Sequence, residues 1–342
     1  MMSLSSVTVA VVASVLPYLV SAAGLNEAAH AAGLEYFGTG VDNPALADPP
    51  YLVGLNNVAD FGSITIGNAQ KWENSEPTQG NFDFSDGDIL ADLADANGQL
   101  LRCHTLIWHY QLPSWVWGGT WTNKTLIEAM QNHITQVVSH YRGRCHHWDV
   151  LNEALNDDGT LRSSIFLQTI GEAYIPIAFA AAAAADPDAK LYYNDYGIEY
   201  GGDKLNGVKY IIDLIRAYGG KIDGVGFQGH FWAYSVPDKD YLKGVLKSAV
   251  AFDVEVAYTE VDDNIELPAD SNELAQQATE YQNIVEACVE TEGCVGITIW
   301  DWTDKYSWIP DVFPGRGAAL PWDENYSKKP AYWGILEGFS GN

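Results

Sequence analysis

Short runs of β-forming residues alternate along this chain with longer amphipathic or alanine-rich segments, and this alternation restricts the fold more than any other feature. The strand-like runs cover residues 34–38, 63–67, 99–107, 146–151, 190–194, 225–228, 254–259 and 295–300. Helix-like segments between them include residues 126–141, 166–185, 204–218, 241–250 and 273–290. Such spacing indicates repeated βα units and a parallel sheet. Because eight strands favour closure over an open doubly wound sheet, we predict an α/β fold, a single (β/α)8 TIM barrel.

Polar and aromatic residues stand at the ends of most of these predicted strands. They are Asn68, His104, Trp108, Asn152, Glu153, Asn194, Asp195, Gln228, His230, Glu260 and Trp300. In a closed barrel the carboxyl ends of the strands meet at one face, which is where TIM barrels carry their sites. Each residue taken alone is equally well explained as a solvated strand end. Together, the carboxylates, amides, histidines and tryptophans meet the needs of a polar site with an apolar floor.

Two glutamates in this set suggest the chemistry of the site. Cleavage of a glycoside needs one carboxyl group to protonate the departing oxygen and a second one on the other side of the sugar. Glu153 and Glu260 follow the fourth and seventh predicted strands, which lie on opposite parts of the barrel mouth. Their side chains can therefore converge across a sugar. Composition alone would favour two unrelated solvated glutamates.

Several long motifs resemble those of glycoside hydrolase family 10, the xylanase family. The segment WDVLNEA at 148–154 resembles the acid/base signature of the family, and TEVD at 259–262 resembles its nucleophile strand. The likeness extends over nearly the whole chain after the first 23 residues. It includes GLEYFG at 33–38, RCHTLIWHYQLPSW at 102–115, YNDY at 193–196, GFQGH at 226–230, TDKYSW at 303–308, DENY at 323–326 and KPAY at 329–332.

The resemblance implies a secreted, fungal-type, acidic endo-1,4-β-xylanase that acts on xylan and xylo-oligosaccharides by a retaining mechanism. Glu153 would be the general acid/base and Glu260 the nucleophile. Asn152 would hold the 2-hydroxyl of the cleaved sugar, while His230 and Asp262 would orient Glu260. The residues implied to bind substrate are Asn68, Lys71, His104, Trp108, Asn194, Gln228, Trp300 and Trp308. For the last two tryptophans, packing in the core is the alternative, because large aromatic residues serve both uses.

The chain departs from the family pattern at Gly67, where the family usually has a glutamate directly before Asn68. In the family that glutamate binds hydroxyls of the sugar one place beyond the cleaved one, on the non-reducing side. Glycine has no side chain to do so. We therefore predict that Gly67→Glu increases the use of short xylo-oligosaccharides, unless Asn68, Gln70 or Lys71 already compensates or the backbone at 67 requires glycine.

The first 23 residues are uncharged, carry an apolar run from 7 to 20 and end in small residues. This pattern predicts a secretory signal peptide over 1–23, cleaved near Ala22 or Ala23, and a catalytic barrel domain over 24–342. An uncleaved anchor is the alternative, although the run is shorter than a membrane span of about 20 residues requires. We expect a secreted monomer.

The chain contains 45 acidic and 18 basic residues, which gives a formal charge of −27. Such a charge makes nucleic acids and anionic membranes poor partners. Because the acidic residues are dispersed and 47% of the chain is hydrophobic, the excess indicates a solvated surface on a folded protein. It also leads us to predict an activity optimum below about pH 5.5.

Four cysteines in an exported chain permit three pairings. Cys288 and Cys294 are close enough in sequence to form a small loop, so we predict this disulfide first, and elimination leaves Cys103 with Cys145. Asn123 and Asn325 are formal N-glycosylation acceptors. We expect that Asn123, after a loop rich in glycine and tryptophan, is accessible, and that Asn325, inside a family motif near the barrel mouth, is unmodified.

Other functional classes fit the sequence less well. A catalytic metal is not expected, because no H-E-x-x-H occurs and the adjacent His146 and His147 should point to opposite faces of a strand. We predict no metal and no cofactor. The absence of G-x-S-x-G and of a glycine-rich phosphate loop argues against esterases and nucleotide-dependent enzymes. Two alternatives remain: another retaining barrel hydrolase such as a cellulase, and an inactive barrel that serves as a lectin or inhibitor.

Overall fold

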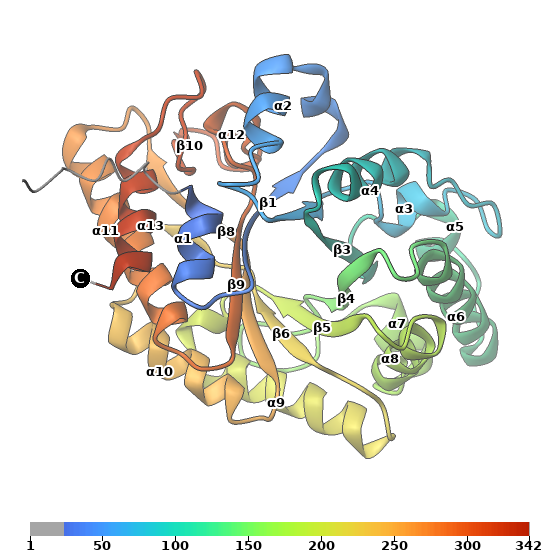
Figure 1. Cartoon of the computed structure of the whole chain (residues 1–342). Coiled ribbons are helices and arrows are strands. Elements are labelled where there is room, and N and C mark those ends of the chain that lie inside the picture. The colour runs from blue at the N-terminus through green and yellow to red at the C-terminus, as the bar shows by residue number, and fades with distance from the viewer. Residues whose placement is uncertain (1–23, 342) are drawn as a thin grey trace, which may run out of the picture.

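The eight predicted strands form a closed parallel barrel (Figure 1). The computed structural model describes residues 24–341, so the predicted signal peptide lies outside the described residues. The barrel strands are β1 (Tyr36–Val41), β2 (Ser63–Ile66), β3 (Leu100–Ile107), β4 (Cys145–Asn152), β5 (Lys190–Asp195), β6 (Gly224–Phe227), β8 (Glu255–Glu266) and β9 (Cys294–Ile299). Each pairs in parallel with the next, and β9 pairs with β1 to close the ring. The predicted TIM barrel is therefore confirmed.

Helices surround the barrel and connect successive strands (Figure 1). The α-helices are α1 (Leu25–Ala31), α2 (Pro49–Leu55), α3 (Trp72–Ser75), α4 (Ser85–Asn97), α5 (Ser114–Trp117), α6 (Asn123–His140), α7 (Ile165–Ile170), α8 (Tyr174–Ala185), α9 (Gly202–Ala217), α10 (Lys239–Val250), α11 (Ser271–Val289), α12 (Ile309–Val312) and α13 (Pro330–Ser340). Short 3-10 helices are η1 (Asn43–Ala47), η2 (Ile198–Tyr200) and η3 (Asp304–Tyr306). None of the helices in residues 24–341 is both long and apolar enough to cross a membrane.

Two predicted elements differ most from the observed ones. The single helix predicted over 166–185 is divided into α7 and α8, because Gly171 ends α7 with a φ of 81°. The strand predicted over 254–259 continues to Glu266 as β8. Its second half leaves the barrel and pairs with β7 (His230–Trp232) and with β10 (Arg316–Gly317). Glu260 therefore lies within a long strand and not at its end.

Both predicted disulfides are present and join neighbouring elements. The Cys103–Cys145 bond links β3 to β4, with Cα atoms 5.7 Å apart. The Cys288–Cys294 bond links α11 to β9, with Cα atoms 5.3 Å apart. All four cysteines are buried and belong to the main apolar core. The bonds thus fasten elements that already pack together.

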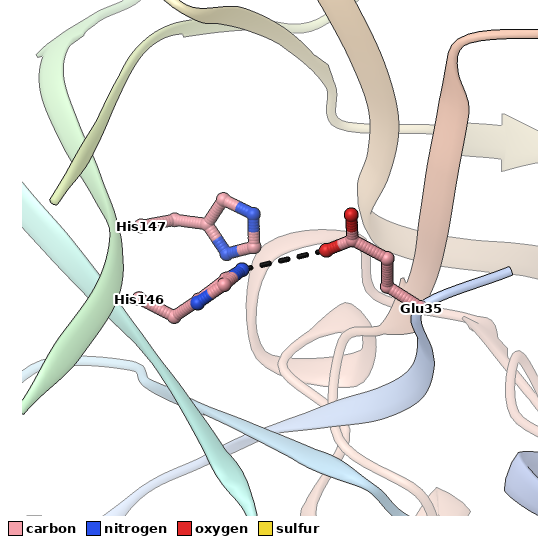
Figure 2. Close-up of side chains that lie close together, drawn as sticks. All are labelled: Glu35, His146 and His147. Carbon is pink, nitrogen blue, oxygen red and sulfur yellow. Dashed lines mark hydrogen bonds and ion pairs between the residues drawn. The ribbon is translucent and has the colours of Figure 1, made fainter. Parts of the chain in front are cut away.

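The expectation that His146 and His147 point to opposite faces of a strand is wrong. Arg102 on β3 pairs with His147, and the preceding residue of β3 pairs with Cys145, so His146 is an extra residue that has no partner in this ladder. Such a bulge breaks the alternation of side chains along a strand. As a result the two imidazole rings lie side by side, with centroids 4.4 Å apart, and both face Glu35 (Figure 2).

Candidate active site

The carboxyl ends of the barrel strands surround a cleft of about 680 Å³. Most of the predicted site residues line it: Asn68, Lys71, His104, Trp108, Asn152, Glu153, Gln228, His230, Glu260, Trp300 and Trp308. Two predicted residues are fully buried behind this lining, namely Asn194 and Asp262. The structure therefore brings these predicted residues to one place, although Asn194 and Asp262 reach a ligand only through their neighbours. Asp195, also expected at a strand end, is fully buried, does not line the cleft and contacts Tyr193 and Lys204.

Glu153 follows β4 directly and is held by two side-chain donors. Its backbone has a positive φ of 53°, a conformation uncommon for a residue other than glycine, and its N–H donates to the Asn194 carbonyl at 2.9 Å. Trp108 donates to one carboxylate oxygen through Nε1 at 2.9 Å, and Gln228 donates to the other through Nε2 at 3.1 Å. Both oxygens are thus fixed before any ligand binds.

Glu260 lies in the middle of β8 and accepts bonds from two other neighbours. Asn194 Nδ2 is 2.8 Å from Oε1, and His230 Nε2 is 3.3 Å from Oε2. Burial would raise the pKa of Glu260, but the bond to His230, the positive charges of His104 and His230, and the Asn194 bond lower it to about 2. Glu260 is therefore a carboxylate, not a carboxylic acid, at any ordinary pH.

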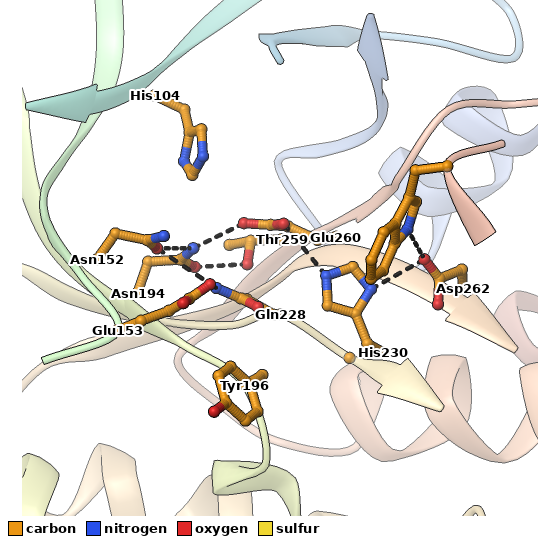
Figure 3. A network of polar contacts seen from close by, with 12 residues as sticks. His104, Asn152, Glu153, Asn194, Tyr196, Gln228, His230, Thr259, Glu260 and Asp262 are labelled. Carbon is orange, nitrogen blue, oxygen red and sulfur yellow. Dashed lines mark hydrogen bonds and ion pairs between the residues drawn. The ribbon is translucent and has the colours of Figure 1, made fainter. Parts of the chain in front are cut away.

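His230 is oriented by a second carboxylate on the same strand as Glu260. Its Nδ1 is 2.9 Å from Oδ2 of Asp262, which also accepts a bond of 2.8 Å from Trp308 Nε1 (Figure 3). Burial would lower the pKa of His230, but Asp262 and Glu260 together raise it well above its ordinary value. The imidazole is consequently a cation that donates to a carboxylate on each side.

A network of amides connects the surroundings of the two glutamates (Figure 3). Asn194 donates to Asn152 Oδ1 at 2.9 Å as well as to Glu260, and Thr259 donates to Asn194 Oδ1 at 2.6 Å. Gln228 donates to Asn152 Oδ1 at 3.4 Å in addition to Glu153. Because Asn152 accepts through its oxygen, its NH₂ group is the donor left for a ligand in the cleft.

The cleft also contains a second cluster of polar side chains, formed by Lys71, Asn68 and Asp42. Lys71 donates to Asn68 Oδ1 at 2.9 Å, and Asn68 in turn donates to Asp42 Oδ2 at 2.6 Å. The ammonium of Lys71 also lies over the Trp108 ring, 4.7 Å from its centroid. Burial lowers the pKa of Lys71, against the pull of Glu260, Asp42 and Glu153. These groups offer charged and neutral partners to hydroxyl groups.

Several residues that line the cleft were not predicted from the sequence. They are Asp42, Tyr110, Gln111, Tyr196, Trp232, Asn264, Ile309, Val312 and Phe313. Asp42 and Tyr196 directly follow β1 and β5, so the rule that strand ends carry the site would have identified them. The others lie in loops, in the short strand β7, in α12 or in the part of β8 beyond the barrel, where no periodic pattern marks them.

The potential glycosylation sites and metal ligands lie outside the cleft. Asn123 is exposed at the start of α6, and Asn325 is exposed too, so burial does not explain why Asn325 should stay unmodified. Within residues 24–341, one group of His, Cys, Asp or Glu side chains has the spacing of a metal site, and it consists of Glu35, His146 and His147. These residues lie at or just before the amino ends of β1 and β4, at the opposite end of the barrel.

Comparison with known proteins agrees with this geometry. The sequence model of glycosyl hydrolase family 10 matches residues 24–338. Endo-1,4-beta-xylanase D of Talaromyces funiculosus is 58% identical over 319 residues, covering 93% of this chain and 78% of that protein. An endo-1,4-beta-xylanase of Agaricus bisporus is 48% identical, covering 92% of this chain and 94% of the relative.

Solved structures give the same result. A GH10 xylanase from Bispora sp. MEY-1, crystallised with xylobiose, superposes with a TM-score of 0.89 at 40% identity and covers 92% of this chain and 99% of that one. The Penicillium canescens endo-1,4-beta-xylanase XylE has a TM-score of 0.90 at 37% identity, with coverages of 93% and 98%.

Proposed function

This chain belongs to glycosyl hydrolase family 10, and on that premise we propose that it is an endo-1,4-β-xylanase that cleaves internal β-1,4-xylosidic bonds of xylan with retention of configuration. Glu153 is the general acid/base and Glu260 the nucleophile. The observation that carries the proposal is the different environment of the two carboxylates. Glu260 is bonded to a cationic histidine, whereas Glu153 is held by neutral tryptophan and glutamine donors.

In the first step Glu260 attacks the anomeric carbon while Glu153 gives its proton to the departing oxygen. A nucleophile must be ionised, and the lowered pKa of Glu260, about 2, ensures that it is. The C–O bond to the aglycone breaks as a covalent ester to Glu260 forms. Glu153, now a carboxylate, then takes a proton from water, which attacks the anomeric carbon and releases the sugar from Glu260.

The surrounding residues stabilise this change in charge. When Glu260 forms the ester, the negative charge that His230 faced is lost, and Asp262 remains to balance the imidazolium. The NH₂ group of Asn152 is placed to donate to the 2-hydroxyl of the sugar, a bond that strengthens in the transition state of glycosidases. Trp300, Trp308 and Trp108 offer apolar ring faces to the pyranose units.

The activity is tested by comparing release of reducing sugar from xylan and from carboxymethyl cellulose. We expect a strong preference for xylan and a loss of at least about 10⁴-fold in kcat for Glu260→Ala. Glu266→Ala is a matched control, because Glu266 is exposed at the end of the same strand. Equal rates on both polysaccharides would instead indicate a cellulase, and an active Glu260→Ala variant would rule out the assigned nucleophile.

The stereochemical outcome is tested separately. If the two carboxyl groups are about 5–5.5 Å apart, as in retaining enzymes, the first product is the β-anomer. Proton NMR recorded within the first turnovers distinguishes it from the α-anomer. Initial release of the α-anomer would show an inverting mechanism, in which Glu260 activates water and forms no ester.

We also propose that residues 1–23 direct export of the chain and are then removed. Support comes from the uncharged apolar leader and from two disulfides in the described residues, which are typical of exported proteins. Intact mass and N-terminal sequencing of the protein from a culture supernatant test this proposal. A chain that starts at Met1, or one that stays with the membrane fraction, would contradict it.

A further inference from the structure

A histidine at the amino end of the barrel is buried without a hydrogen-bond partner. His147 is fully buried, and neither ring nitrogen has a hydrogen-bond partner among the described residues; the nearest carboxylate oxygen, Oε1 of Glu255, is 4.0 Å from Nε2. Its ring is packed against the rings of Tyr36 and Tyr192, with centroid distances of 5.7 and 5.0 Å. A buried imidazole left without a partner forfeits the free energy of at least one hydrogen bond, so a missing partner is indicated.

A second imidazole, His146, and a carboxylate, Glu35, lie beside it, and both can act as metal ligands (Figure 2). His146 Nε2 is 3.4 Å from Glu35 Oε2, and the ligand atoms of Glu35, His146 and His147 all lie within 4.8 Å of one another. With bonds of ~2.0–2.1 Å, two ligands of a tetrahedral ion are about 3.4 Å apart. The wider separations close by side-chain rotation of Glu35 or His146, both of which reach solvent.

The charges around these three residues favour a cation. Glu35 and Glu255 bring two negative charges, and Lys190 brings one positive charge. Lys190 bonds mainly to Glu255, because its distance to Glu35 is 4.0 Å. The nearby Arg102 is neutralised by its ion pair with Asp149. A divalent ion therefore enters a region with a net charge of −1 on a chain of −27.

We propose that Glu35, His146 and His147 bind a divalent transition-metal ion of the Zn²⁺ class, with water as the fourth ligand. Two imidazoles and one carboxylate suit zinc, while Mg²⁺ and Ca²⁺ prefer all-oxygen sites. Glu255 is not the fourth ligand, because it is already held by Lys190 and by the Tyr192 hydroxyl at 2.6 Å.

The place of the site in the fold indicates what the metal does. Glu35 directly precedes β1, and the histidines begin β4, so the ion connects two strands that are not neighbours in the barrel. Glu153 and Glu260 line the cleft at the other end of the barrel. The ion therefore stabilises the closed barrel and takes no part in the cleavage of substrate.

Titration calorimetry of the metal-free full-length enzyme with ZnSO₄ tests the proposal. We expect one saturable site in wild type and affinity weakened by at least ~10-fold in both His146→Ala and Glu35→Gln. His30→Ala is the matched control, because His30 is exposed on α1 and should leave affinity unchanged. At a zinc concentration 100-fold above Kd, the Tm of wild type and of His30→Ala should increase on the order of 5 °C. The Tm of His146→Ala and of Glu35→Gln should not increase.

Near-UV circular dichroism establishes that each variant is folded, and substitution by Co²⁺ should give the absorption of a four-coordinate ion in wild type and in His30→Ala, but not in the two site variants. Unchanged zinc affinity in His146→Ala and Glu35→Gln, or the absence of saturable binding in wild type, would overturn the proposal. If saturating zinc inhibited wild type and the His146→Ala variant equally, zinc would bind in the cleft instead.

Discussion

Glu260 keeps its charge in acid mainly because of His230, and this dependence can be measured. The acid limb of kcat/KM reports ionisation of the nucleophile in the free enzyme. With the pKa of Glu260 lowered to about 2, we expect this limb below about pH 3 in wild type. An acid limb at such low pH agrees with the acidic optimum that we predict from the charge of the chain, because the nucleophile then stays ionised in acid.

Replacing His230 by asparagine removes both the cation and one of the two side-chain hydrogen bonds that Glu260 accepts, and leaves the bond from Asn194. We expect the acid limb of His230→Asn to move up toward the ordinary glutamate value of about 4.3. Initial rates on an aryl xyloside between pH 2 and 7, with enzyme returned to pH 5 after each exposure as a stability control, measure this shift. An unmoved limb with only a lower kcat would show that His230 serves packing alone.

Asp42 changes the interpretation of the glycine at position 67. A Cβ atom at Gly67 would lie 2.8 Å from Asp42 Oδ1, and Gly67 is not among the glycines with positive φ. The carboxylate of Asp42 thus occupies the space where a side chain at 67 would begin. We conclude that Gly67→Glu alone would force two carboxylates together, so the gain predicted from the sequence should not occur.

We expect instead that Asp42 supplies the carboxylate for the sugar beyond the cleaved one. Asp42→Ala should lower kcat/KM on xylotriose by about 10- to 100-fold, since a hydrogen bond to a charged group contributes about 1.5–3 kcal/mol. Hydrolysis of an activated aryl xyloside, which does not reach this part of the cleft, should be almost unchanged.

The double variant Asp42→Ala/Gly67→Glu tests this exchange of roles. It should recover much of the lost rate on xylotriose, because glutamate at 67 then finds the space free. Equal losses on xylotriose and on the aryl xyloside would place Asp42 in structural support of the cleft.

At the scale of elements, the two disulfides should differ in their contribution to stability. The Cys103–Cys145 bond closes a segment with a sequence separation of 42, and the Cys288–Cys294 bond one of 6. Chain entropy predicts contributions to the free energy of unfolding of about 4 and about 2 kcal/mol respectively. Urea unfolding of the two double alanine variants, Cys103→Ala/Cys145→Ala and Cys288→Ala/Cys294→Ala, compares them. If Cys288→Ala/Cys294→Ala lost more free energy of unfolding, native-state strain would outweigh chain entropy.

The barrel strands could be predicted because each is a short run of β-forming residues that alternates with longer amphipathic or alanine-rich segments. The extension of β8 to Glu266 could not, since its pairing with β7 and β10 joins segments that are distant in sequence. The start of α8 after Gly171 was also missed, because glycine within an alanine-rich segment is tolerated in helices and marks no certain end.

The residues of the candidate site, like the elements of the fold, were predicted only in part. Residues at strand ends were found because barrel closure brings them to one face. Asp42 satisfies the same rule and was still missed, because the first strand was predicted to end at residue 38, whereas β1 continues to Val41. The side-by-side arrangement of His146 and His147 depends on a bulge where β4 pairs with β3. The sequence of a single strand does not indicate such a bulge.

On the scale of the whole molecule, the pH of greatest stability depends on buried carboxyl groups of two kinds. Glu260 has a lowered pKa, about 2, so its contribution to folding is present above the unfolded value and is lost as pH falls through about 2. Burial raises the pKa of Asp195 to about 7, against the charge of Lys204 and the Tyr193 bond. Burial likewise raises the pKa of Asp301 to about 7, against the N–H groups of Trp302 and Thr303.

An acid whose pKa is raised stabilises the fold below its unfolded value, and that stability is lost as pH rises through the folded value. The contributions of Asp195 and Asp301 are therefore complete near pH 4 and gone above pH 7. Repulsion among surface carboxylates on a chain of charge −27 acts in the same direction. We expect the greatest free energy of unfolding between about pH 4 and 5, and a decline toward pH 7.

Asp301→Asn separates the buried carboxyl from the surface charge. The amide keeps an oxygen for the N–H of Trp302, now 2.6 Å away, and gains an NH₂ group toward the Tyr51 hydroxyl, but it cannot ionise. The free energy of unfolding should therefore rise at pH 7 by on the order of 2 kcal/mol and stay unchanged at pH 4. Urea titrations at both pH values measure this, with Asp311→Asn as the control at an exposed site. If both variants gain equally at pH 7, general repulsion and not the burial of Asp301 sets the pH dependence, and 0.5 M NaCl should then abolish the gain, since the Debye length falls well below ~8 Å.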